Sequence, residues 1–455
     1  MCTTYINYTL VPLFMVKAEY PLVKEDIALE KVRASTGFKL KIYNTTTKEG
    51  IKATPIMFVL LDLCTGTYTI TEIIDQVSGQ SGNPPAELVQ AVEDTLTELQ
   101  EKGIISMSKN PRKGNKIKEI TLQYPLEAAQ IEITNRCNLR CLHCFNNSGI
   151  PHPNELSTEE ILSLLDTLGA MGVFHVTFTG GEPLLHPDFF TIIEHARKAP
   201  MSVDIFTNGT LITEDMVRKF KKIGIRRFNI SIDSMDEVVH DTFRGKRGAL
   251  KKTLHTIKLL KEAGFAVKIS ISLSQLNKNK IVDILKYFRE NNLTDFDVMP
   301  VRYSGRGVNG LAVSLNEYYR SLIEQFTYLK KEFPDGITKI REKKQEGCSI
   351  GRDSIGIKSD GTVMPCPGCD RGPFLGNVRD INLEKVWEDN KTLEIIRNTT
   401  TQTDKTCKNC KYLCFCLGCI ANAVSVEGII KCYTPYSCAL NRAYDEIIGL
   451  VKEKS

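Results

Sequence analysis

The sequence predicts an α/β protein in which a partial (β/α)6 barrel follows a small α+β domain and precedes a cysteine-rich region. Three observations lead to this fold class. Strand-like and helical segments alternate between residues 127 and 310, short helical patterns fill residues 1 to 110, and ten of the 15 cysteines lie after residue 340. A chain of 455 residues is long enough for two to four domains.

The first 110 residues predict a small domain of short helices and strands. Thr54–Cys64 is an apolar run that predicts a buried helix, and Thr71–Val77 has helical spacing. Apolar residues recur every three or four positions in Pro84–Lys102, which predicts a longer helix, and Ile104–Met107 can form a strand. This pattern predicts a winged-helix-like domain, which a basic linker, Lys109–Lys118, ends.

Residues 127 to 310 predict parallel βαβ units. Helical patterns such as Thr158–Met171 and Leu250–Ala263 separate apolar runs of strand length, and a helix between successive strands makes those strands parallel. Six such units form a partial barrel that is open on one side. The predicted strands are Ala129–Thr134, Val173–Thr179, Ser202–Thr207, Arg227–Ile232, Val267–Leu273 and Phe296–Val301.

The rest of the chain predicts a helical connector and then a region that metal centres organise. Residues 311 to 345 have a helical pattern, whereas residues 346 to 455 combine glycines and closely spaced cysteines with little periodicity. Such a segment buries too little apolar surface to fold alone, so bound metal is expected to stabilise it. Cys2 and Cys64 stand apart and are expected to be a terminal thiol and a small buried side chain.

Composition predicts a cytoplasmic protein that binds no nucleic acid and has no membrane span. The formal net charge of +5 is small for this length. No apolar stretch of about 18 residues occurs, and the short apolar run Tyr8–Val16 lacks the basic start and cleavage site of a signal peptide. Because thiols stay reduced in the cytoplasm, clustered cysteines there indicate metal rather than disulfides.

Three closely spaced cysteines follow the first predicted strand of the barrel. Cys137, Cys141 and Cys144 form a C-x3-C-x2-C motif at the carboxyl end of the sheet, where active sites of such folds lie. Three thiolates can hold three irons of a 4Fe–4S cluster and leave the fourth iron open to a ligand. A zinc site with a further ligand elsewhere is the alternative, since the spacing permits it.

The segment Cys137-Asn138-Leu139-Arg140-Cys141-Leu142-His143-Cys144 resembles the signature of the radical S-adenosylmethionine (SAM) superfamily. Later motifs agree with this resemblance in their order. Gly180-Gly181-Glu182-Pro183 follows the second strand, and the resemblance implies that this turn binds the methionine amino group of SAM. His143 is by the same resemblance a candidate adenine contact, and a loop histidine without a role is the alternative.

The resemblance also implies SAM contacts at the end of the fourth strand and beyond it. Ser231 and Asp233 stand where the family places ribose contacts, and Arg244 is a candidate bidentate partner of the methionine carboxylate. Solvated loop residues or a surface ion pair are the alternatives for these three. Asn208-Gly209, after the third strand, mainly indicates a turn. The cofactors that the resemblance implies are SAM and 4Fe–4S clusters.

The second cysteine array resembles the SPASM domain, the auxiliary-cluster region of peptide-modifying radical SAM enzymes. Cys348 and Cys366 flank Gly361, and the run Cys407-x2-Cys410-x5-Cys416-x2-Cys419 precedes Cys438. The short spacing at the end of this run is similar to that of the sactipeptide synthases of the subtilosin type. Zinc-ribbon pairs are the alternative, because CxxC spacing permits them too.

The SPASM resemblance implies one or two auxiliary 4Fe–4S clusters. It divides the ligands into two sets: Cys348, Cys366 and Cys419 for one cluster, and Cys407, Cys410, Cys416 and Cys438 for the other. Cys369 is either a fourth ligand of the first set or leaves that cluster with an open iron for a substrate thiolate. Cys414 competes with Cys416, and Cys432 with Cys438, which a predicted helix from Ala439 to Val451 follows.

The N-terminal domain resembles, in size and position, the precursor-recognition element of peptide maturases. Such a domain captures a leader peptide as an added strand at a sheet edge. A nucleic-acid-binding winged helix is the alternative, but DNA contact needs basic residues, and the longest predicted helix of the domain is acidic. Its acidic residues are Glu87, Glu93, Asp94, Glu98 and Glu101. The resemblance implies two partners, a precursor peptide bound through its leader and a flavodoxin- or ferredoxin-type electron donor.

Together the resemblances imply an enzyme that modifies a ribosomally synthesised peptide, as in bacteriocin biosynthesis. The expected reaction is thioether formation. A 5′-deoxyadenosyl radical takes a hydrogen from the peptide, a cysteine thiolate bonds to that carbon, and an auxiliary cluster removes the extra electron. Carbon–carbon crosslinking, epimerisation and sulfatase-type oxidation use the same chemistry and stay open. A non-catalytic zinc-binding scaffold is the alternative outside this class.

Overall fold

The structure of the protein is a computed structural model that describes most of the chain. The described residues are 19–34, 37–44, 46, 49–51, 53–79, 84–112, 118–199, 201–225, 227–302, 304–308, 310–333, 348, 350–400, 403–412, 416, 419–421, 423 and 434–448. The chain divides into two compact units, Met1–Arg33 with Gly37–Thr121, and Ala34–Thr36 with Leu122–Ser455.

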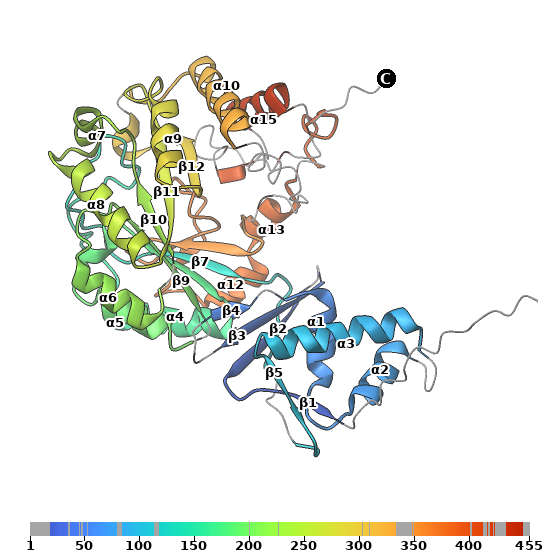
Figure 1. Ribbon diagram of the computed structural model, residues 1–455. Coiled ribbons are helices and arrows are strands. Elements are labelled where there is room, and N and C mark those ends of the chain that lie inside the picture. The colour runs from blue at the N-terminus through green and yellow to red at the C-terminus, as the bar shows by residue number, and fades with distance from the viewer. Residues whose placement is uncertain are drawn as a thin grey trace, which may run out of the picture. The chain divides into compact units, whose positions relative to one another are not determined.

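The smaller unit combines two small sheets with three helices (Figure 1). One sheet pairs β1 (Tyr20–Val23) with β5 (Ile105–Ser108) in antiparallel register. The other has the order β4-β3-β2-β6, and its strands are Ile27–Ala34 (β2), Gly37–Asn44 (β3), Glu49–Ile51 (β4) and Lys118–Thr121 (β6). The strand predicted at Ile104–Met107 is therefore confirmed, whereas the longer strands β2 and β3 were not predicted.

Three helices cover the core of this unit, as their sequence patterns predict. They are α1 (Pro55–Leu63), α2 (Ile70–Ser78) and α3 (Ala86–Glu101). Thr54 and Thr69 begin the first two, because each hydroxyl accepts a backbone N–H of the first turn. The apolar faces of these helices meet in a core that includes Met57, Ile73 and Leu96.

The larger unit is built on the six parallel strands that the sequence predicts (Figure 1). Their spatial order is β12-β11-β10-β9-β8-β7, which follows the chain without interruption. The strands are Ala128–Glu132 (β7), His175–Thr179 (β8), Ser202–Thr207 (β9), Arg227–Ser231 (β10), Ala266–Leu273 (β11) and Phe296–Pro300 (β12). The intervening helices are Thr158–Ala170 (α4), Phe189–Ala196 (α5), Glu214–Ile223 (α6), Glu237–Arg244 (α7), Ala249–Glu262 (α8) and Ile281–Glu290 (α9).

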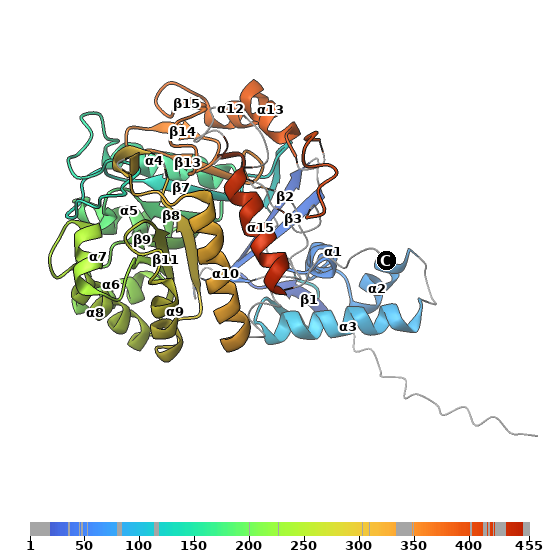
Figure 2. The ribbon, with the colours of Figure 1, turned by 90° about the horizontal axis from the view of Figure 1, so that it is seen from above.

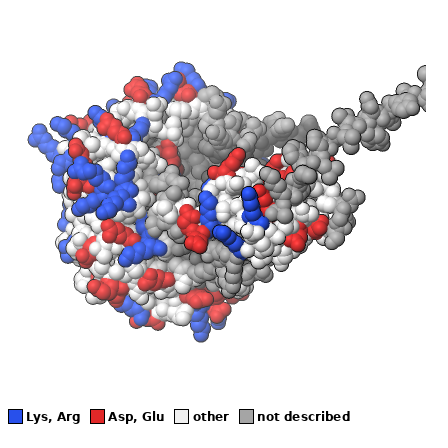
Figure 3. All heavy atoms as spheres, turned by 60° about the horizontal axis from the view of Figure 1, so that its bottom comes forward, with Lys and Arg blue, Asp and Glu red and all other residues white. Residues whose placement is uncertain are grey.

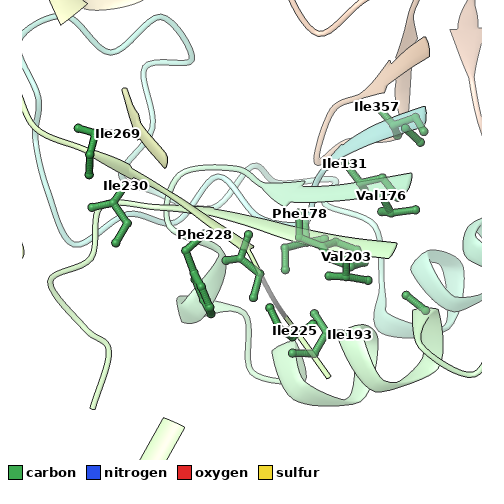
Figure 4. Close-up of a cluster of buried hydrophobic side chains, with 14 of the residues drawn as sticks. Ile131, Val176, Phe178, Ile193, Val203, Ile225, Phe228, Ile230, Ile269 and Ile357 are labelled. Atoms are coloured by element: carbon green, nitrogen blue, oxygen red, sulfur yellow. The ribbon is translucent and has the colours of Figure 1, made fainter. Parts of the chain in front are cut away.

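The two faces of this sheet differ in polarity. Figure 4 shows apolar strand side chains, among them Ile131, Phe178 and Phe228, that point toward Ile193 and the helical layer. The opposite face carries polar residues in register, such as Thr177 beside Asp204 and Ser231 beside Ser270. Burial of the apolar face stabilises the barrel. The polar face lines the interior of the barrel, where a substrate can bind.

The C-terminal region adds three strands to the barrel sheet. β13 (Ser354–Ile357) pairs in parallel with β7, and β14 (Thr362–Met364) and β15 (Gly376–Asn377) continue the sheet as antiparallel strands. The sequence did not predict these strands. Two short 3-10 turns, Pro183–Leu185 and Gly305–Val308, lie in the loops after β8 and β12.

Within the described residues, four further helices follow the last barrel strand in the chain. They are α10 (Leu315–Glu332), α12 (Leu383–Asp389), α13 (Lys391–Asn398) and α15 (Pro435–Ile448). In Figures 1 and 2, α10 and α15 lie side by side, and the rings of Phe326 and Tyr444 meet edge to face between them. α10 confirms the helical pattern expected after residue 311, and residues 334–347 lie outside the described residues.

The helix predicted to begin after Cys438 begins earlier, so that prediction is wrong. α15 begins at Pro435 and contains Cys438. The reason is a reciprocal cap, because the Thr434 N–H donates to the Ser437 hydroxyl at 2.8 Å and the Ser437 N–H donates to the Thr434 hydroxyl at 3.1 Å. Cys438 is therefore presented from the first turn of a helix.

Charge is mixed on the surface that Figure 3 draws. Basic side chains gather in one group at the left of this view, and elsewhere basic and acidic side chains are interspersed. Among the residues described, no helix combines the length and apolar character that crossing a lipid bilayer requires.

Candidate active site

The loop after β7 brings the three motif cysteines together. Burial raises the pKa of Cys137 to about 12, and the nearby Cys141 and Cys144 thiolates add to that rise. Backbone bonds shape the loop: the Cys144 N–H donates to the Cys141 carbonyl at 3.3 Å, and the Ser148 N–H donates to the Cys144 sulfur at 3.3 Å. Metal binding would favour the thiolate form that burial opposes, because iron is bound by deprotonated sulfur.

The glycine turn after β8 lies directly against this loop. The Gly181 N–H donates to the Thr134 carbonyl and the Glu182 N–H to the Arg136 carbonyl, both at 2.7 Å. A Cβ atom at Gly180 would lie 2.2 Å from the Thr134 carbonyl oxygen, and one at Gly181 would lie 2.2 Å from that of Arg136. The two glycines are therefore required by close backbone approach, which places the turn beside the cysteine loop.

Glu182 is fully buried and anchors the turn. Its carboxylate accepts bonds from the Thr207 hydroxyl at 2.7 Å and from the Asn208 N–H at 2.8 Å. Burial raises the pKa of Glu182 to about 7, and these hydrogen bonds oppose the rise. The hydrogen bonds of this carboxyl hold the end of β9 in place. Because its pKa lies near 7, a cationic ammonium group bound nearby would favour the ionised form.

Asp233 and Arg244, predicted as separate SAM contacts, form a buried ion pair. Arg244 Nη2 lies 2.6 Å from Asp233 Oδ2, and the other Asp233 oxygen accepts the Ser272 N–H at 2.9 Å. Arg244 Nη1 also lies 3.8 Å from the Cys141 sulfur. The pair thus links the ends of β10 and β11 to the cysteine loop, and Ser231 lies at the same end of β10. The surface ion pair considered as an alternative is wrong for this pair, since both side chains are buried.

His143 is half-buried within the cysteine loop. Its ring stacks on that of Phe243 with 4.1 Å between centroids and 10° between planes. Burial lowers the pKa of His143, and the charge of Arg244 adds to the effect, so the ring is neutral at pH 7. Within the described part of the chain, His143 Nδ1 is buried without a hydrogen-bond partner. A neutral ring with a spare ring nitrogen fits a heteroaromatic ligand.

Arg306 is a site residue that the sequence did not predict. Its Nε donates to the Cys141 carbonyl at 2.8 Å, its Nη1 to the Ser148 carbonyl at 3.0 Å, and its own N–H to the Cys144 carbonyl at 2.9 Å. Gly305 lies so close to the loop that a Cβ atom would be 2.3 Å from the Cys144 carbonyl oxygen. The sequence signal was Gly305-Arg306-Gly307 just after the last barrel strand, where site residues are expected.

The first auxiliary set gathers in one apolar cluster, together with Cys369. Cys348, Cys366, Cys369 and Cys419 pack with Ile350 and neighbouring side chains. Burial raises the pKa of Cys366 to about 11, the Gly368 N–H opposes that rise, and Cys348 and Cys419 are near enough to add to it. Burial also raises the pKa of Cys369, and Cys366 and Cys419 contribute. Four sulfurs in one buried place are the number that a fully ligated 4Fe–4S cluster needs.

The second auxiliary set is more exposed. Cys407 is buried, Cys416 is half-buried, and Cys410 and Cys438 are exposed. The Cys410 N–H donates to the Cys407 carbonyl at 2.8 Å, which forms the turn expected of a CxxC pair. The grouping of these four as one ligand set stays a prediction. Cys414 and Cys432 lie outside the described residues.

Among the described residues, no three His, Cys, Asp or Glu side chains converge on one position as the ligands of a zinc ion do. Cysteines that bind different corners of a 4Fe–4S cube need no common centre, because each bonds its own iron.

Comparison with known families places the first array and part of the second in two described domains. The profile of the radical SAM superfamily matches residues 131–292, and that of an iron–sulfur cluster-binding domain, SPASM, matches residues 348–411. The first range contains the cysteine loop, the glycine turn and the Asp233–Arg244 pair. The second contains Cys348, Cys366, Cys369, Cys407 and Cys410.

Relatives match over most of the chain. An AdoMet-dependent heme synthase of Methanosarcina barkeri is 30% identical and covers 67% of this chain and 94% of that protein. The antilisterial bacteriocin subtilosin biosynthesis protein AlbA of Bacillus subtilis is 27% identical and covers 85% and 88%. Streptococcus suis SuiB bound to precursor peptide SuiA shares the fold at 18% identity and a TM-score of 0.61, covering 92% of this chain and 99% of SuiB. The chain belongs to the radical SAM superfamily, which uses a 4Fe–4S cluster and SAM, and it carries the superfamily's SPASM domain for auxiliary clusters.

Proposed function

We propose that this enzyme joins a cysteine sulfur of a ribosomally made peptide to a carbon of the same peptide. The similarity to the subtilosin biosynthesis protein carries the proposal, because it extends over 85% of this chain and 88% of that protein. The match to the heme synthase covers nearly all of that protein but leaves a third of this chain without a counterpart. A tetrapyrrole substrate therefore leaves more of this chain without a role than a peptide does.

The barrel residues have distinct roles in this proposal. Cys137, Cys141 and Cys144 hold the SAM-cleaving cluster, and Gly180-Gly181-Glu182 holds the methionine end of SAM. When bound, the cluster and SAM supply a 5′-deoxyadenosyl radical that takes a hydrogen atom from the peptide. The Asp233–Arg244 pair fixes the strand ends around the cofactor, and Arg244 places a positive charge near the Cys141 sulfur.

His143 and Ser231 complete the proposed cofactor site. His143 is held by its stack on Phe243, so its ring orientation is set before the adenine binds. Ser231 ends β10 on the polar face of the sheet, where its hydroxyl can reach a ribose. Both assignments predict weaker SAM binding rather than loss of the cluster when either residue becomes alanine.

The auxiliary cysteines serve electron transfer in this proposal. Cys348, Cys366, Cys369 and Cys419 supply four thiolates, which leave no open iron for a substrate thiolate. Of the two roles that the sequence left open for Cys369, the fourth ligand is the one we propose. The second set, Cys407, Cys410, Cys416 and Cys438, lies nearer the surface and suits exchange with an external flavodoxin- or ferredoxin-type donor.

The smaller unit is the proposed reader of the peptide leader. Its four-stranded sheet ends in the short strand β4 on one side and β6 on the other. An extended peptide can add to such an edge through main-chain hydrogen bonds. The acidic side chains of α3 make the alternative, a DNA-binding surface on that helix, unfavourable.

Mass spectrometry of a cysteine-bearing precursor tests the proposed reaction. A cysteine-bearing precursor, sought as a small open reading frame beside the gene, is incubated anaerobically with reconstituted enzyme, SAM and reductant. We expect a loss of two hydrogens per crosslink, and the linked cysteine no longer reacts with iodoacetamide. Retained thiol reactivity with the same mass loss would instead indicate a carbon–carbon link. An unchanged peptide with continued release of 5′-deoxyadenosine would contradict the proposal for that peptide.

A further inference from the structure

Arg302 lies between the two buried cysteine groups. It follows β12, and its Nη1 donates to the Gly368 carbonyl at 2.9 Å, between Cys366 and Cys369. On its other side, the guanidinium lies 5.9 Å from the ring centroid of Phe145, the residue after Cys144. The side chain is 31% exposed, so its charge is only partly screened by water.

The contact with Gly368 fixes a donor to a cysteine sulfur. The Gly368 N–H donates to the Cys366 sulfur at 3.4 Å. A Cβ atom at Gly368 would lie 3.2 Å from Arg302 Nη2 and 3.0 Å from the Ala421 Cβ, so the glycine is closely enclosed. Arg302 therefore holds the peptide segment that directs this N–H toward the sulfur.

Asp370 opposes the charge of Arg302. Asp370 Oδ1 lies 3.7 Å from Arg302 Nη1, and the Asp370 side chain is only 4% exposed. The Ser304 hydroxyl bonds to Asp370 and lies 3.4 Å from the Phe145 carbonyl oxygen. Opposite charges thus stand next to the same cysteines, and their effects on a nearby redox centre have opposite signs.

We propose that Arg302 raises the reduction potential of the cluster held by Cys348, Cys366, Cys369 and Cys419. Reduction adds one negative charge to a cluster, and a fixed cation nearby stabilises that charge. A hydrogen bond to a ligand sulfur acts in the same direction. Arg302 is thus a positioning residue that acts through charge and through Gly368, without touching the peptide.

The benefit of a raised potential rests on the proposed function, thioether formation. Joining sulfur to a carbon radical forms one C–S bond, sends the thiol proton to solvent and leaves one surplus electron. The acceptor of that electron is the oxidised auxiliary cluster, which becomes reduced by one electron. A raised potential makes this transfer more favourable, so Arg302 would favour completion of the crosslink.

A redox titration tests the proposal without peptide or SAM. The full chain, reconstituted with iron and sulfide, is titrated anaerobically and followed by electron paramagnetic resonance. We expect Arg302→Gln to move the midpoint of one auxiliary cluster to a more negative potential, and Arg302→Lys to retain most of the wild-type value. Asp370→Asn is expected to move the same midpoint to a more positive potential. Because no peptide takes part, a failure here is distinct from a failure of the thioether proposal.

An exposed arginine provides the matched control. Arg218 on α6 is 68% exposed, and Arg218→Gln removes the same charge from a helix on the outside of the barrel. No midpoint is expected to move in this variant. If Arg302→Gln retains iron and sulfide but moves no midpoint, the proposal is overturned. It is also overturned if Arg302→Gln and Asp370→Asn shift the potential in the same direction, because that would indicate a loosened loop rather than a charge effect. Should Arg302→Gln lose the cluster, Asp370→Asn still decides the question, because a midpoint that does not move or moves to a more negative potential in that variant also overturns the proposal.

Discussion

The two cysteine regions of the molecule are built in different ways. The barrel loop is held by backbone contacts, because Gly181, Glu182 and Arg306 donate hydrogen bonds to its carbonyls. In the C-terminal region, Cys348, Cys366, Cys369 and Cys419 meet in a small apolar cluster that short loops contribute to. The first site is positioned by the sheet before metal arrives, whereas the second depends more on the metal that it binds.

This difference shows which of the two cysteine sites needs a preorganised protein framework. An open iron must meet SAM and a substrate in fixed geometry, so the loop that carries it is attached to the most rigid part of the fold. A cluster that only passes electrons tolerates a looser setting. Four experiments test whether the two cysteine regions differ in this way.

The largest effect is expected from the thiols of the barrel loop. Cys141→Ala should reduce release of 5′-deoxyadenosine by about 1000-fold or more, because the cluster loses a ligand, while amide exchange in residues 131–149 stays nearly unchanged. The matched control is Cys64→Ala, which removes a fully buried thiol from the smaller unit and costs about 1 kcal/mol of stability without loss of iron. Unfolding of the loop in Cys141→Ala would show that this loop, like the C-terminal region, depends on its metal.

The next effect concerns the Asp233–Arg244 pair. Arg244→Ala leaves a buried carboxylate without its partner and should destabilise the larger unit by about 3–5 kcal/mol. The double variant Arg244→Ala with Asp233→Ala should lose less than Arg244→Ala alone, since no buried charge remains unpaired. Chemical unfolding of the metal-free chain measures both. Equal losses of unfolding free energy in the single and the double variant would mean that the pair acts through packing alone.

A smaller effect is expected in the glycine turn. Gly181→Ala pushes a methyl group into the Arg136 carbonyl and should cost about 3 kcal/mol and weaken SAM binding. Gly248→Ala serves as its control, because its Cβ atom would meet nothing within 4 Å and only its positive φ opposes alanine, at about 1 kcal/mol. Thermal unfolding and SAM titration compare the two. Similar SAM affinity in both variants would argue against the close approach.

The smallest effect is a dependence of stability on pH. The pKa of Glu182 is raised to about 7 by burial, so between about pH 4.3 and pH 7 the folded state keeps a proton that the unfolded chain releases. Stability should therefore fall as pH rises through this window. Glu182→Gln should remove on the order of 2 kcal/mol of that fall, whereas Glu194→Gln, on exposed α5 surface, should leave the profile unchanged. If stability fell more steeply with rising pH in Glu182→Gln than in the wild-type protein, the predicted direction of the pH dependence would be wrong.

Much of the fold could be predicted because the barrel repeats one pattern. Apolar strands between amphipathic helices predicted all six parallel strands, and three cysteines after the first strand predicted where the site lies. β13 could not be predicted, because Ser354–Ile357 is short and pairs with β7 only through the tertiary fold. The missed strand β3 did carry a signal, since Leu40 and Ile42 alternate with Lys39 and Lys41.

The site was predicted by residue type but not by contact. The sequence placed Asp233 and Arg244 near the cofactor, yet their pairing with each other depends on how α7 folds back over the cysteine loop. Arg306 was missed because it binds backbone carbonyls, which no side-chain motif reveals. The gathering of Cys369 with Cys348, Cys366 and Cys419 also depends on three separate loops.

The pairing of β7 with β13 has a consequence for how the protein is made. β7 leaves the ribosome long before β13, so one edge of the nascent barrel has no partner while half of the chain is still being translated. An unpaired edge of this kind invites pairing with another chain. Shortened forms that end before Ser354 should therefore aggregate. The region that carries the auxiliary cysteines also supplies the strand that completes the catalytic sheet.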